Sequence, residues 1–573
     1  MSNSILNKSY SMKIKNLIIE IPAFRISNRD IELLIYGNIF YNNINEESLL
    51  DISKFILSPE EFVKGDFCFS LKLDNVIYLG SSRSATHPIY FRKIKNELIY
   101  SLKFNEIVES STENVLSEEA SFQFLTYEYV ADPLTLVEGV YKVPSANMLV
   151  FKDDLSFSLQ EFNLQISLCN EDTHSMSAFK DSIYKAHENR TSDTQANTLL
   201  LSGGVDSCIS AIVLKDVVKN SDVNCFTFST LNAEQDEFSE AKFTADYLGL
   251  NVERVIVDPT AHVDLETLIY NSNFFYPGAI MVSAIARQAD DDTNFFSCQD
   301  TRLHTPALNP LDKLVFAASP LQRDLFSKAM GLFSDNFSSN KTINKVITRG
   351  KMANDLPNYI NELFFHKHKM NLGNYERDSN FSTALDDCIS KKFTNFKGNS
   401  RQIYNEIIKL AWHRQYSDDI QYLISTAAQF NSSCQVPWYD EELAFVSAQL
   451  PMKQATKFVK GRSGHSSKSK RVNKYILRQA FDGLLPNEIL FRDKAVCVTN
   501  HLFLKGAYRP YIEGMKINSL LFKTKGGSNL AIKTLFDIHY NHYLDYQIND
   551  YNKVVEMQNI VALELYCKVY NLS

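Results

Sequence analysis

The chain has 573 residues, of which 45% are hydrophobic and 22% charged, as in ordinary globular proteins, and this length predicts two or three domains. A formal net charge of −8 and a pI near 5.9 argue against bulk nucleic-acid binding and against a polybasic membrane anchor. The nine cysteines are scattered with no C-x-x-C pair, no signal peptide is recognisable and no run of about 18 apolar residues occurs. We therefore expect a cytoplasmic protein with reduced thiols and no membrane span.

Residues 1–165 have the pattern of a mostly β region. Short alternating apolar runs, such as 67–73 and 75–79, are separated by Asp, Asn and Gly turns. Within this region only residues 117–129 are plainly helical in pattern. We therefore predict a first domain over residues 1–165.

From residue 175 onward strands and helices alternate. Residues 223–228 and 252–257 are predicted strands, and residues 234–248 between them are a predicted helix. This alternation predicts a doubly wound parallel sheet with its ligands at the carboxyl ends of the strands. Beyond residue 319 the chain is chiefly helical; we interpret the polar segment 333–400 as a helical insertion over the active face, and the Gly-, Ser- and Lys-rich segment 461–470 as mobile.

The run 199–207, Leu-Leu-Leu-Ser-Gly-Gly-Val-Asp-Ser, predicts a buried strand, a glycine turn and then a helix from Cys208 to Val218. Two glycines let the backbone approach an anion closely, Ser202 and Ser207 offer hydroxyl donors, and the helix directs its N–H groups at the same point. Asp206 is unusual beside an anion unless a divalent cation accompanies it. The spacing and lysine of a Walker loop are absent. The pattern resembles the pyrophosphate loop of N-type ATP pyrophosphatases; the alternative is a Ser- and Gly-rich turn without a ligand.

Several further segments, in order along the chain, resemble the class-B asparagine synthetase family over the whole length except 333–400. They are Gly65-Asp66-Phe67-Cys68-Phe69, His87-Pro88-Ile89-Tyr90, 127–140, Val436-Pro437-Trp438-Tyr439-Asp440, Leu450-Pro451, 474–478 and 485–490. The resemblance implies an α/β protein with an α+β, Ntn-hydrolase-like β-sandwich at the N-terminus. It implies a degenerate glutamine amidotransferase-like domain over 1–165. Over 175–573 it implies an ATP pyrophosphatase (adenine nucleotide alpha hydrolase-like) synthetase domain with helical additions.

Two departures from the family pattern narrow this interpretation. Family glutaminases use a cysteine immediately after the initiator methionine, where this chain has Ser2, and its first cysteine is Cys68, inside a predicted strand. We therefore expect no glutamine hydrolysis. Loss of the glutaminase with retention of the ATP site resembles β-lactam synthetases and the macrolactam cyclases of lasso peptides, in which an amine of the same molecule attacks the activated carboxylate.

The second departure follows the strand ending at Phe296. The family carries S-G-x-G-x-D there, whereas this chain reads Ser-Cys-Gln-Asp-Thr-Arg-Leu-His-Thr-Pro over 297–306, without either glycine. Asp300 is the expected counterpart of the second Mg²⁺ ligand, paired with Asp206. We expect Arg302 and His304, with Gln299 nearby, to contact phosphate or substrate. The alternative is that the altered loop belongs to a protein that no longer catalyses.

The resemblance also assigns roles to two lysines. Lys494 matches the family lysine beside the adenylate, and Lys474 the second lysine, which binds phosphates; Arg492 is a weaker phosphate candidate. The predicted nucleotide-binding residues are Leu200, Leu201, Ser202, Gly203, Gly204, Asp206, Ser207, Phe228, Ser229 and Ser297. The base that deprotonates the amine stays open, with His304, Asp418 and Asp419 as candidates.

These features predict an ATP- and Mg²⁺-dependent ligase that adenylates a carboxylate, releases pyrophosphate and joins the acyl group to an amine. The leading hypothesis is a peptide macrolactam cyclase of lasso type, with a precursor peptide and its processing protease as partners. A β-lactam synthetase-like enzyme acting on a small molecule is the close variant. An ammonia-dependent asparagine synthetase and a non-catalytic nucleotide-binding relative are the remaining alternatives. Neither nucleic acid nor membrane is expected as a partner.

Overall fold

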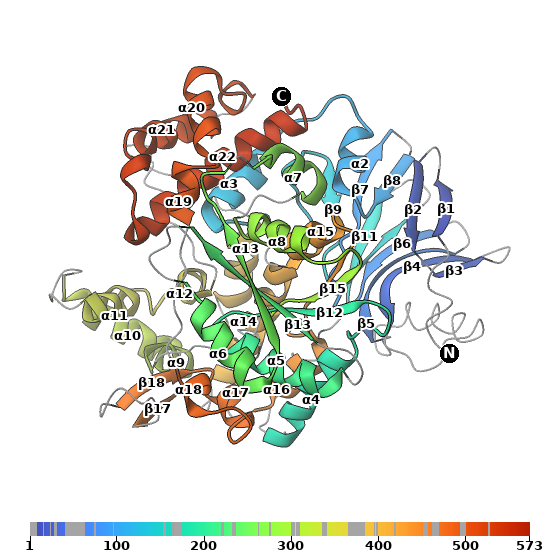
Figure 1. Ribbon diagram of the computed structural model, residues 1–573. Helices are drawn as coiled ribbons and strands as arrows, with labels where there is room; N and C mark the ends of the chain where they lie inside the picture. The colour runs from blue at the N-terminus through green and yellow to red at the C-terminus, as the bar shows by residue number, and fades with distance from the viewer. Residues whose placement is uncertain are drawn as a thin grey trace.

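The computed structural model describes most of the chain (Figure 1). The residues outside the description are 1–8, 15–16, 23, 28–30, 40–63, 74–75, 96, 153–155, 163, 165–174, 219–222, 232–235, 262, 274–276, 300–303, 305–309, 335–337, 339–340, 365–383, 395, 397–398, 417–419, 451–455, 461–468, 493–499 and 525–527.

The N-terminal region consists mainly of antiparallel strands. Its strands are β1 (Ser9–Ile14), β2 (Leu17–Pro22), β3 (Phe24–Ser27), β4 (Ile31–Ile39), β5 (Gly65–Leu73), β6 (Val76–Ser81), β7 (Tyr90–Ile94), β8 (Glu97–Ser101), β9 (Val140–Lys142), β10 (Asn147–Phe151) and β11 (Phe157–Glu161). A six-stranded sheet has the order β11-β10-β6-β5-β4-β3 and a three-stranded sheet the order β8-β7-β9. Side chains from both sheets, among them Tyr36, Cys68 and Phe91, share one buried cluster, so the two sheets pack against each other. The Ntn-hydrolase-like β-sandwich stays a prediction.

Two helices accompany these sheets. Helix α3 (Glu118–Tyr127) confirms the predicted helix over 117–129, and its N-cap Ser117 accepts a hydrogen bond from the backbone of Ala120. Helix α2 (Phe104–Glu109) was not predicted. It has six residues, too few for a helical period to show in the sequence, and it forms because Phe104, Ile107 and Val108 are buried on one side.

The predicted parallel sheet is confirmed, with five strands in the order β14-β13-β12-β15-β16. They are β12 (Ala196–Leu200), β13 (Asn224–Thr230), β14 (Asn251–Val257), β15 (Thr293–Phe296) and β16 (Ser433–Gln435). Successive residues face opposite covered sides: Cys225 and Phe296 belong to one hydrophobic cluster, and Phe226 and Phe295 to the other. The strand order reverses beside β12, which places a ligand-binding crevice at the carboxyl ends of β12 and β15.

Helices cover both faces of this sheet and build the rest of the molecule. In chain order they are α4 (Met176–Glu188), α5 (Val205–Val217), α6 (Phe238–Leu248), α7 (Leu265–Ser272), α8 (Pro277–Gln288), α9 (Pro310–Ala317), α10 (Pro320–Gly331), α11 (Lys341–Lys351), α12 (Leu356–Phe364), α13 (Ala384–Phe393), α14 (Ser400–Gln415), α15 (Gln421–Ala428), α16 (Glu441–Ala448), α17 (Tyr475–Ala480), α18 (Asn487–Leu490), α19 (Asn500–Lys505), α20 (Arg509–Asn518), α21 (Ser528–Tyr540) and α22 (Tyr551–Val569). Short 3₁₀ turns lie at Leu521–Lys523, Tyr543–Asp545 and Ile548–Asp550. Among the described residues, none of the helices has the length and apolar character that crossing a bilayer requires.

Most described residues of the segment 333–400 are helical, as predicted, and form α11, α12 and α13. Its position over the active face stays a prediction. Helices α10 and α11 pack against each other and extend outward from the body of the molecule (Figure 1). The flanks of segment 461–470 form an antiparallel hairpin of β17 (Thr456–Lys460) and β18 (Ser469–Asn473), which the sequence did not predict; residues 461–468 lie outside the described part.

One hydrophobic cluster joins the N-terminal sheets to the helices behind the parallel sheet. It contains Phe67 and Phe69 of β5 together with Trp412, Tyr439 and Met557 from the C-terminal half. Figure 1 shows the N-terminal strands beside the parallel sheet, and α22 packs against both α3 and α7. The first region is therefore packed against the second across a buried apolar surface.

Candidate functional site

The loop 202–207 lies at the carboxyl end of β12, next to the point where the strand order reverses. Leu201 extends the pairing with β13 by donating to the carbonyl of Phe226 at 2.8 Å. Helix α5 then begins at Val205, three residues earlier than predicted, with Gly204 as its N-cap. The first N–H groups of α5 have no partner within the helix, so together with its dipole they form a favourable anion site.

The two serine hydroxyls of this loop fix its shape. The Ser207 Oγ lies 2.9 Å from the carbonyls of both Ser202 and Gly204, and it accepts from the Ser202 N–H at 3.1 Å. The Ser202 Oγ accepts from the Gly204 N–H at 3.2 Å and lies 3.0 Å from the Ser207 Oγ. In this structure the buried Ser207 hydroxyl hydrogen-bonds within the loop, and its contact with a bound anion stays a prediction.

Asp206 forms an ion pair with Lys474, although 268 residues separate them in the chain. Lys474 is the N-cap of α17 and has left-handed backbone angles, φ 54° and ψ 38°. Such a conformation is costly for a non-glycine residue and concentrates at functional sites. The other carboxylate oxygen of Asp206, Oδ1, is buried and has no hydrogen-bond partner. The structure thus brings together two of the residues predicted for the site and leaves one oxygen available for a cation.

Arg492 supports the loop from outside. Its Nε donates to the carbonyl of Gly203 at 2.7 Å, and its Nη1 donates to the carbonyl of Glu240 at 3.1 Å. Its Nη2 lies 3.1 Å from the Sγ of Cys208. Arg492 was proposed from the sequence as a weak phosphate ligand, but in the structure its guanidinium holds the loop and α6 together.

The other residues predicted to bind the nucleotide lie at the ends of the neighbouring strands β13 and β15. Ser229 of β13 is buried, and its Oγ accepts from the Nε of Arg254 at 2.9 Å. Phe228, one residue earlier, is partly buried. Thr230 at the end of the same strand is buried, and its hydroxyl has no hydrogen-bond partner, which makes it a further candidate for contact with a ligand. Ser297 extends the pairing of β15 with β16 through its N–H, 2.9 Å from the carbonyl of Gln435.

The described residues of the altered loop differ in burial. Cys298 and Gln299 are partly exposed and follow Ser297 directly, near the carboxyl end of the sheet. His304, in contrast, is buried; its Nδ1 lies 3.1 Å from the Ser447 Oγ and its Nε2 lies 2.5 Å from the carbonyl of Trp438. Burial lowers the pKa of His304 to about 4. In this structure His304 is therefore a buried packing residue, and its prediction as a substrate contact or base is corrected.

A buried polar network behind the loop escaped the sequence analysis. The Nε2 of His187 lies 2.9 Å from the Ser210 Oγ on α5, and the same hydroxyl accepts from the indole N–H of Trp438 at 3.0 Å. Burial lowers the pKa of His187 to about 4. Because these contacts join segments more than 20 and more than 200 residues apart, no local pattern could indicate them.

Several predicted residues lie outside the described part of the chain. They are Ser2, Asp300, Arg302, Asp418, Asp419 and Lys494. Their roles stay predictions. Within the described residues, no three His, Cys, Asp or Glu side chains are placed to hold a metal ion. A hard cation that keeps most of its waters needs only one or two carboxylates, and Asp206 Oδ1 fits that requirement.

Comparison with known proteins gives a family match and one curated relative. The family model described as "Asparagine synthase" matches residues 178–294 and 328–558, together more than half of the chain. The stretch between the two matched ranges contains the altered loop 297–306, whereas segment 333–400 lies inside the second range. The chain is 23% identical over 461 residues to "Asparagine synthetase [glutamine-hydrolyzing] 1" of Bacillus subtilis (strain 168), over 75% of this chain and 67% of that protein.

Similarity to solved structures is weaker. The allosteric regulatory enzyme of purine biosynthesis is 11% identical, with 42% of this chain and 63% of that chain covered and a TM-score of 0.17. Glutamine phosphoribosylpyrophosphate amidotransferase of B. subtilis, complexed with ADP and GMP, is 11% identical, with 49% and 58% covered and a TM-score of 0.15. Glutamine-dependent NAD⁺ synthetase of Acinetobacter baumannii, in complex with ADP, is 12% identical, with 68% and 80% covered and a TM-score of 0.17. The chain spans less than two thirds of the first two, and scores this low carry no structural argument.

Proposed function

The chain belongs to the asparagine synthase family, and from that premise we propose that it activates a carboxylate with ATP and lets an amine of the same peptide attack it, closing a macrolactam. The coarse class that follows from the family is an ATP-dependent carbon–nitrogen ligase. Formation of the ring within one peptide is the finer part of the proposal.

One observation carries the proposal: the loop 202–207 has a fixed shape at the start of α5, and the Asp206–Lys474 pair lies beside it. The helix N-terminus suits the phosphates of ATP, and Lys474 adds a mobile positive charge. Asp206 Oδ1, which has no partner, would hold Mg²⁺, and the ion would neutralise phosphate charge when bound. Binding of Mg²⁺ and ATP would then separate Asp206 from Lys474 and give each a new partner.

The reaction that we propose balances in two steps. A carboxylate oxygen of the substrate attacks the α-phosphorus of ATP, and pyrophosphate leaves toward the loop. The amine then attacks the acyl carbon, AMP leaves with the oxygen, and the amine loses a proton to a base. Most of the catalytic work of the protein is positioning and charge stabilisation. Lys494 and Lys474 are the cations that we assign to the adenylate and to the phosphates.

Supply of the amine by the substrate itself is supported by the N-terminal region. Cys68 is completely buried between the two sheets of the sandwich, and burial raises the pKa of its thiol, so Cys68 is not a nucleophile. A ligase that takes its amine from the substrate itself needs no ammonia source. A β-lactam synthetase-like reaction on a small amino acid shares this property.

The test uses full-length protein, Mg·ATP and linear peptides that carry a free N-terminal amine and an Asp or Glu side chain. The expected result is peptide-dependent release of pyrophosphate and AMP, with a product lighter than the peptide by one water. The N-acetylated peptide is the matched control: it should still give adenylation but no ring. Lys494→Ala should abolish product while ATP still binds. Release of pyrophosphate without any dependence on a carboxylate substrate would contradict the proposal.

A second candidate function is ammonia-dependent synthesis of asparagine, which the relationship to the Bacillus asparagine synthetase favours. This function predicts asparagine formation from aspartate, ammonium and Mg·ATP, and no requirement for a peptide. A direct comparison of aspartate plus ammonium with the linear peptides separates the two. If neither substrate supports turnover and ATP still binds, the chain is a non-catalytic relative.

A further inference from the structure

Buried cations in this protein are, with one exception, paired with acids. Among the described residues, the buried lysine and arginine side chains are Arg83, Lys142, Arg190 and Arg323. The first three have a carboxylate oxygen within 3.4 Å. The acids are, in the same order, Glu441, Asp132, and Asp66 together with Asp440. Pairing of this kind is what makes a buried charge tolerable.

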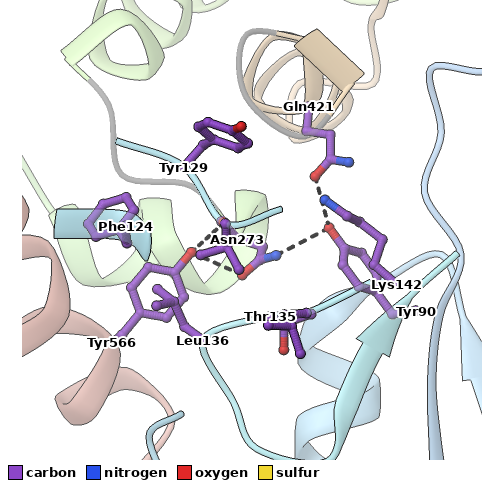
Figure 2. Close-up of a pocket in the computed structure, with 11 residues that line it drawn as sticks. Tyr90, Phe124, Tyr129, Thr135, Leu136, Lys142, Asn273, Gln421 and Tyr566 are labelled. Atoms are coloured by element: carbon purple, nitrogen blue, oxygen red, sulfur yellow. Dashed lines mark hydrogen bonds between the residues drawn. The ribbon is translucent and has the colours of Figure 1, made fainter. Parts of the chain in front are cut away.

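Lys142 shows how such a cation is accommodated (Figure 2). It lines a cavity of about 50 Å³ at the junction between the N-terminal region and the helices behind the parallel sheet. Its ammonium lies 2.7 Å from an oxygen of Asp132. Three other side chains of this cavity bond to one another: the Tyr566 hydroxyl donates to the Asn273 Oδ1 at 3.0 Å, and the Asn273 Nδ2 donates to the Tyr90 hydroxyl at 3.2 Å. The positive charge at the cavity is thus neutralised within the protein.

Arg323, on helix α10, is the exception. It is only 7% exposed, yet within the described part of the chain its guanidinium has neither an ion pair nor a hydrogen-bond acceptor. Burial lowers the pKa of this guanidinium, and no acid counteracts the effect. The nearest acids in the sequence have other partners. Asp324 pairs with Lys328 at 2.8 Å, and Asp312 accepts from the Tyr359 hydroxyl at 2.7 Å. A buried cation without a partner is strongly unfavourable, so an anion from outside the chain is expected.

One edge of the Arg323 guanidinium is reached by solvent. Its Nη1 is completely buried and has no partner. Its Nε and Nη2 also lack a partner among the residues that the structure describes, but they are not completely buried. These two nitrogens form one edge of a planar group, and their N–H bonds point in parallel. A carboxylate or phosphate can therefore accept from both at once.

The position of Arg323 in α10 also favours an anion. Arg323 is the fourth residue of the helix, which begins at Pro320. The positive end of the helix dipole lies at this turn, so a cation there is unfavourable and an anion beside it is favourable. The span from α9 to α12, residues 310–364, contains seven Lys and Arg against five Asp and Glu, in a chain that otherwise has an excess of acids. The local charge therefore suits a negatively charged ligand.

A single isolated cation selects a singly charged ligand. A carboxylate neutralises Arg323 and places two oxygens opposite its two donors, whereas a phosphate brings more negative charge than one guanidinium can neutralise. Arg323 also lies between the two ranges that match the asparagine synthase family, while the loop 202–207 and Lys474 lie inside them. ATP is the ligand that the family shares. A ligand bound outside the matched ranges is therefore expected to be the substrate that is particular to this chain.

We propose that Arg323 binds a carboxylate of the peptide substrate that takes no part in ring closure, supplied by its C-terminus or by an acidic side chain. The identity of the peptide rests on the proposed macrolactam reaction, but the binding of the carboxylate does not. A second contact of this kind holds the peptide while its other carboxylate is activated.

The first test is ligand-observed saturation-transfer NMR on full-length protein. N-acetylglycine is the probe for a peptide carboxylate, and N-acetylglycinamide is its neutral counterpart. N-acetylglycine should bind saturably and N-acetylglycinamide should not. Arg323→Met, which keeps most of the aliphatic stem, should weaken N-acetylglycine by roughly tenfold or more. Lys328→Met is the matched control, because it removes an exposed cation from the same helix; it should bind N-acetylglycine as the unaltered protein does.

The thermal unfolding midpoint of each variant shows whether it is folded. Arg323→Lys provides a second variant, which keeps the charge but not the two parallel donors, and its affinity should lie between those of the unaltered protein and Arg323→Met. Equal binding by the unaltered protein and Arg323→Met would overturn the proposal. Absence of saturation by N-acetylglycine would overturn it as well, because Arg323 would then be hydrated only. Displacement of N-acetylglycine by a lower concentration of inorganic phosphate would show a phosphate site instead.

The second test uses the linear peptides of the macrolactam assay. Arg323→Met should raise the KM for the peptide roughly tenfold and leave kcat and the KM for ATP unchanged. Peptides with a C-terminal amide, or with Gln in place of the second acidic residue, show which carboxylate is bound: removal of that carboxylate raises the KM of the unaltered protein but not of Arg323→Met. An unchanged KM in Arg323→Met would overturn the role of Arg323 in peptide binding. If N-acetylglycine binding depends on Arg323 but no peptide is cyclised, the proposed function fails and the carboxylate site stands.

Discussion

The charges of Asp206 and Lys474 neutralise each other in the structure, and a ligand that binds both side chains must separate them. The pair is partly exposed, with 22% of the lysine and 19% of the aspartate side chain accessible. Its contribution to stability is therefore small, and the cost of opening it is correspondingly low. The left-handed backbone at Lys474 holds the ammonium beside the start of α5. These features are those of a site prepared for exchange with a charged ligand.

Asp206→Asn should reduce the affinity for Mg·ATP by roughly tenfold or more, because a neutral amide is a poor ligand for Mg²⁺. The amide also carries no charge that would pair with the Lys474 ammonium. Asp216→Asn is the control, since Asp216 lies near the other end of α5 and accepts from Tyr184 at 2.6 Å. It should leave affinity unchanged. Calorimetric titration with a non-hydrolysable ATP analogue and Mg²⁺ measures both. Equal affinities in the two variants would remove Asp206 from the metal site.

The buried histidines predict how stability depends on pH. Burial lowers the pKa of His187 and of His304 from 6.5 to about 4. Between about pH 4 and pH 6.5 these histidines are protonated in the unfolded chain but not in the folded chain. Their full contribution to the free energy of unfolding is therefore present above about pH 6.5 and is lost as the pH falls toward about 4. Each histidine contributes a slope of up to about 1.4 kcal/mol per pH unit.

Urea unfolding at about pH 7.5, 6.0 and 5.0 should show this fall in the free energy of unfolding. His187→Gln keeps a hydrogen-bonding side chain but cannot take up a proton, so its stability should fall less steeply with pH. An identical slope for His187→Gln and the unaltered protein would show that His187 does not titrate on unfolding.

At the scale of the element, the loop before α5 depends on close packing against α6. A Cβ added to Gly203 would lie 2.8 Å from the Cβ of Glu240, so the loop or the helix would have to move. Gly203→Ala should therefore weaken Mg·ATP binding by roughly tenfold and lower stability by about 1–3 kcal/mol.

Gly331→Ala is the matched control, because a Cβ at Gly331, the last residue of α10, meets nothing within 4 Å. It should leave ATP binding unchanged and alter stability by less than about 1 kcal/mol. Isothermal titration and thermal unfolding of the two variants give the comparison. Normal ATP affinity in Gly203→Ala would show that the loop is not part of the nucleotide site.

Local sequence patterns were sufficient for the elements around this loop. The apolar run before Ser202 and the glycine turn predicted β12 and α5, because both depend on neighbours in the sequence. The role of Ser207 was not predictable in the same way: a hydroxyl beside an anion-binding loop can face the ligand or the backbone, and only the folded geometry decides. His304 was misassigned because its partners, Trp438 and Ser447, are more than 130 residues away.

At the scale of the whole molecule, the boundary between the two regions was predicted from the change in strand and helix pattern, but the structure joins the regions through a common core. The indole N–H of Trp412 donates to the carbonyl of Arg83 at 2.7 Å, and the Tyr416 hydroxyl lies 3.4 Å from the carbonyls of His87 and Val143. Removal of residues 1–165 would expose these aromatic side chains to water. The N-terminal region is therefore a structural part of the protein, whether or not it retains chemistry of its own.

Arg190 links the two regions through buried ion pairs. Its fully buried guanidinium donates to Asp66 of β5 at 2.6 and 2.7 Å and to Asp440, the N-cap of α16, at 3.0 Å. Arg190→Met would leave two buried carboxylates without their cation and should lower the free energy of unfolding by roughly 3–5 kcal/mol. Lys242→Met removes an exposed pair with Asp246, 52% and 59% accessible, and should cost about 1 kcal/mol or less.

Thermal and urea unfolding of the full-length variants test this difference. Asp66→Asn in the Arg190→Met background should recover part of the loss, because it removes one of the two unpaired charges. Recovery of stability would show that the loss in Arg190→Met comes from unpaired buried charge, because Asp66→Asn would not restore lost packing. If Arg190→Met and Lys242→Met shift unfolding equally, the two regions are held together by their shared apolar core and not by Arg190.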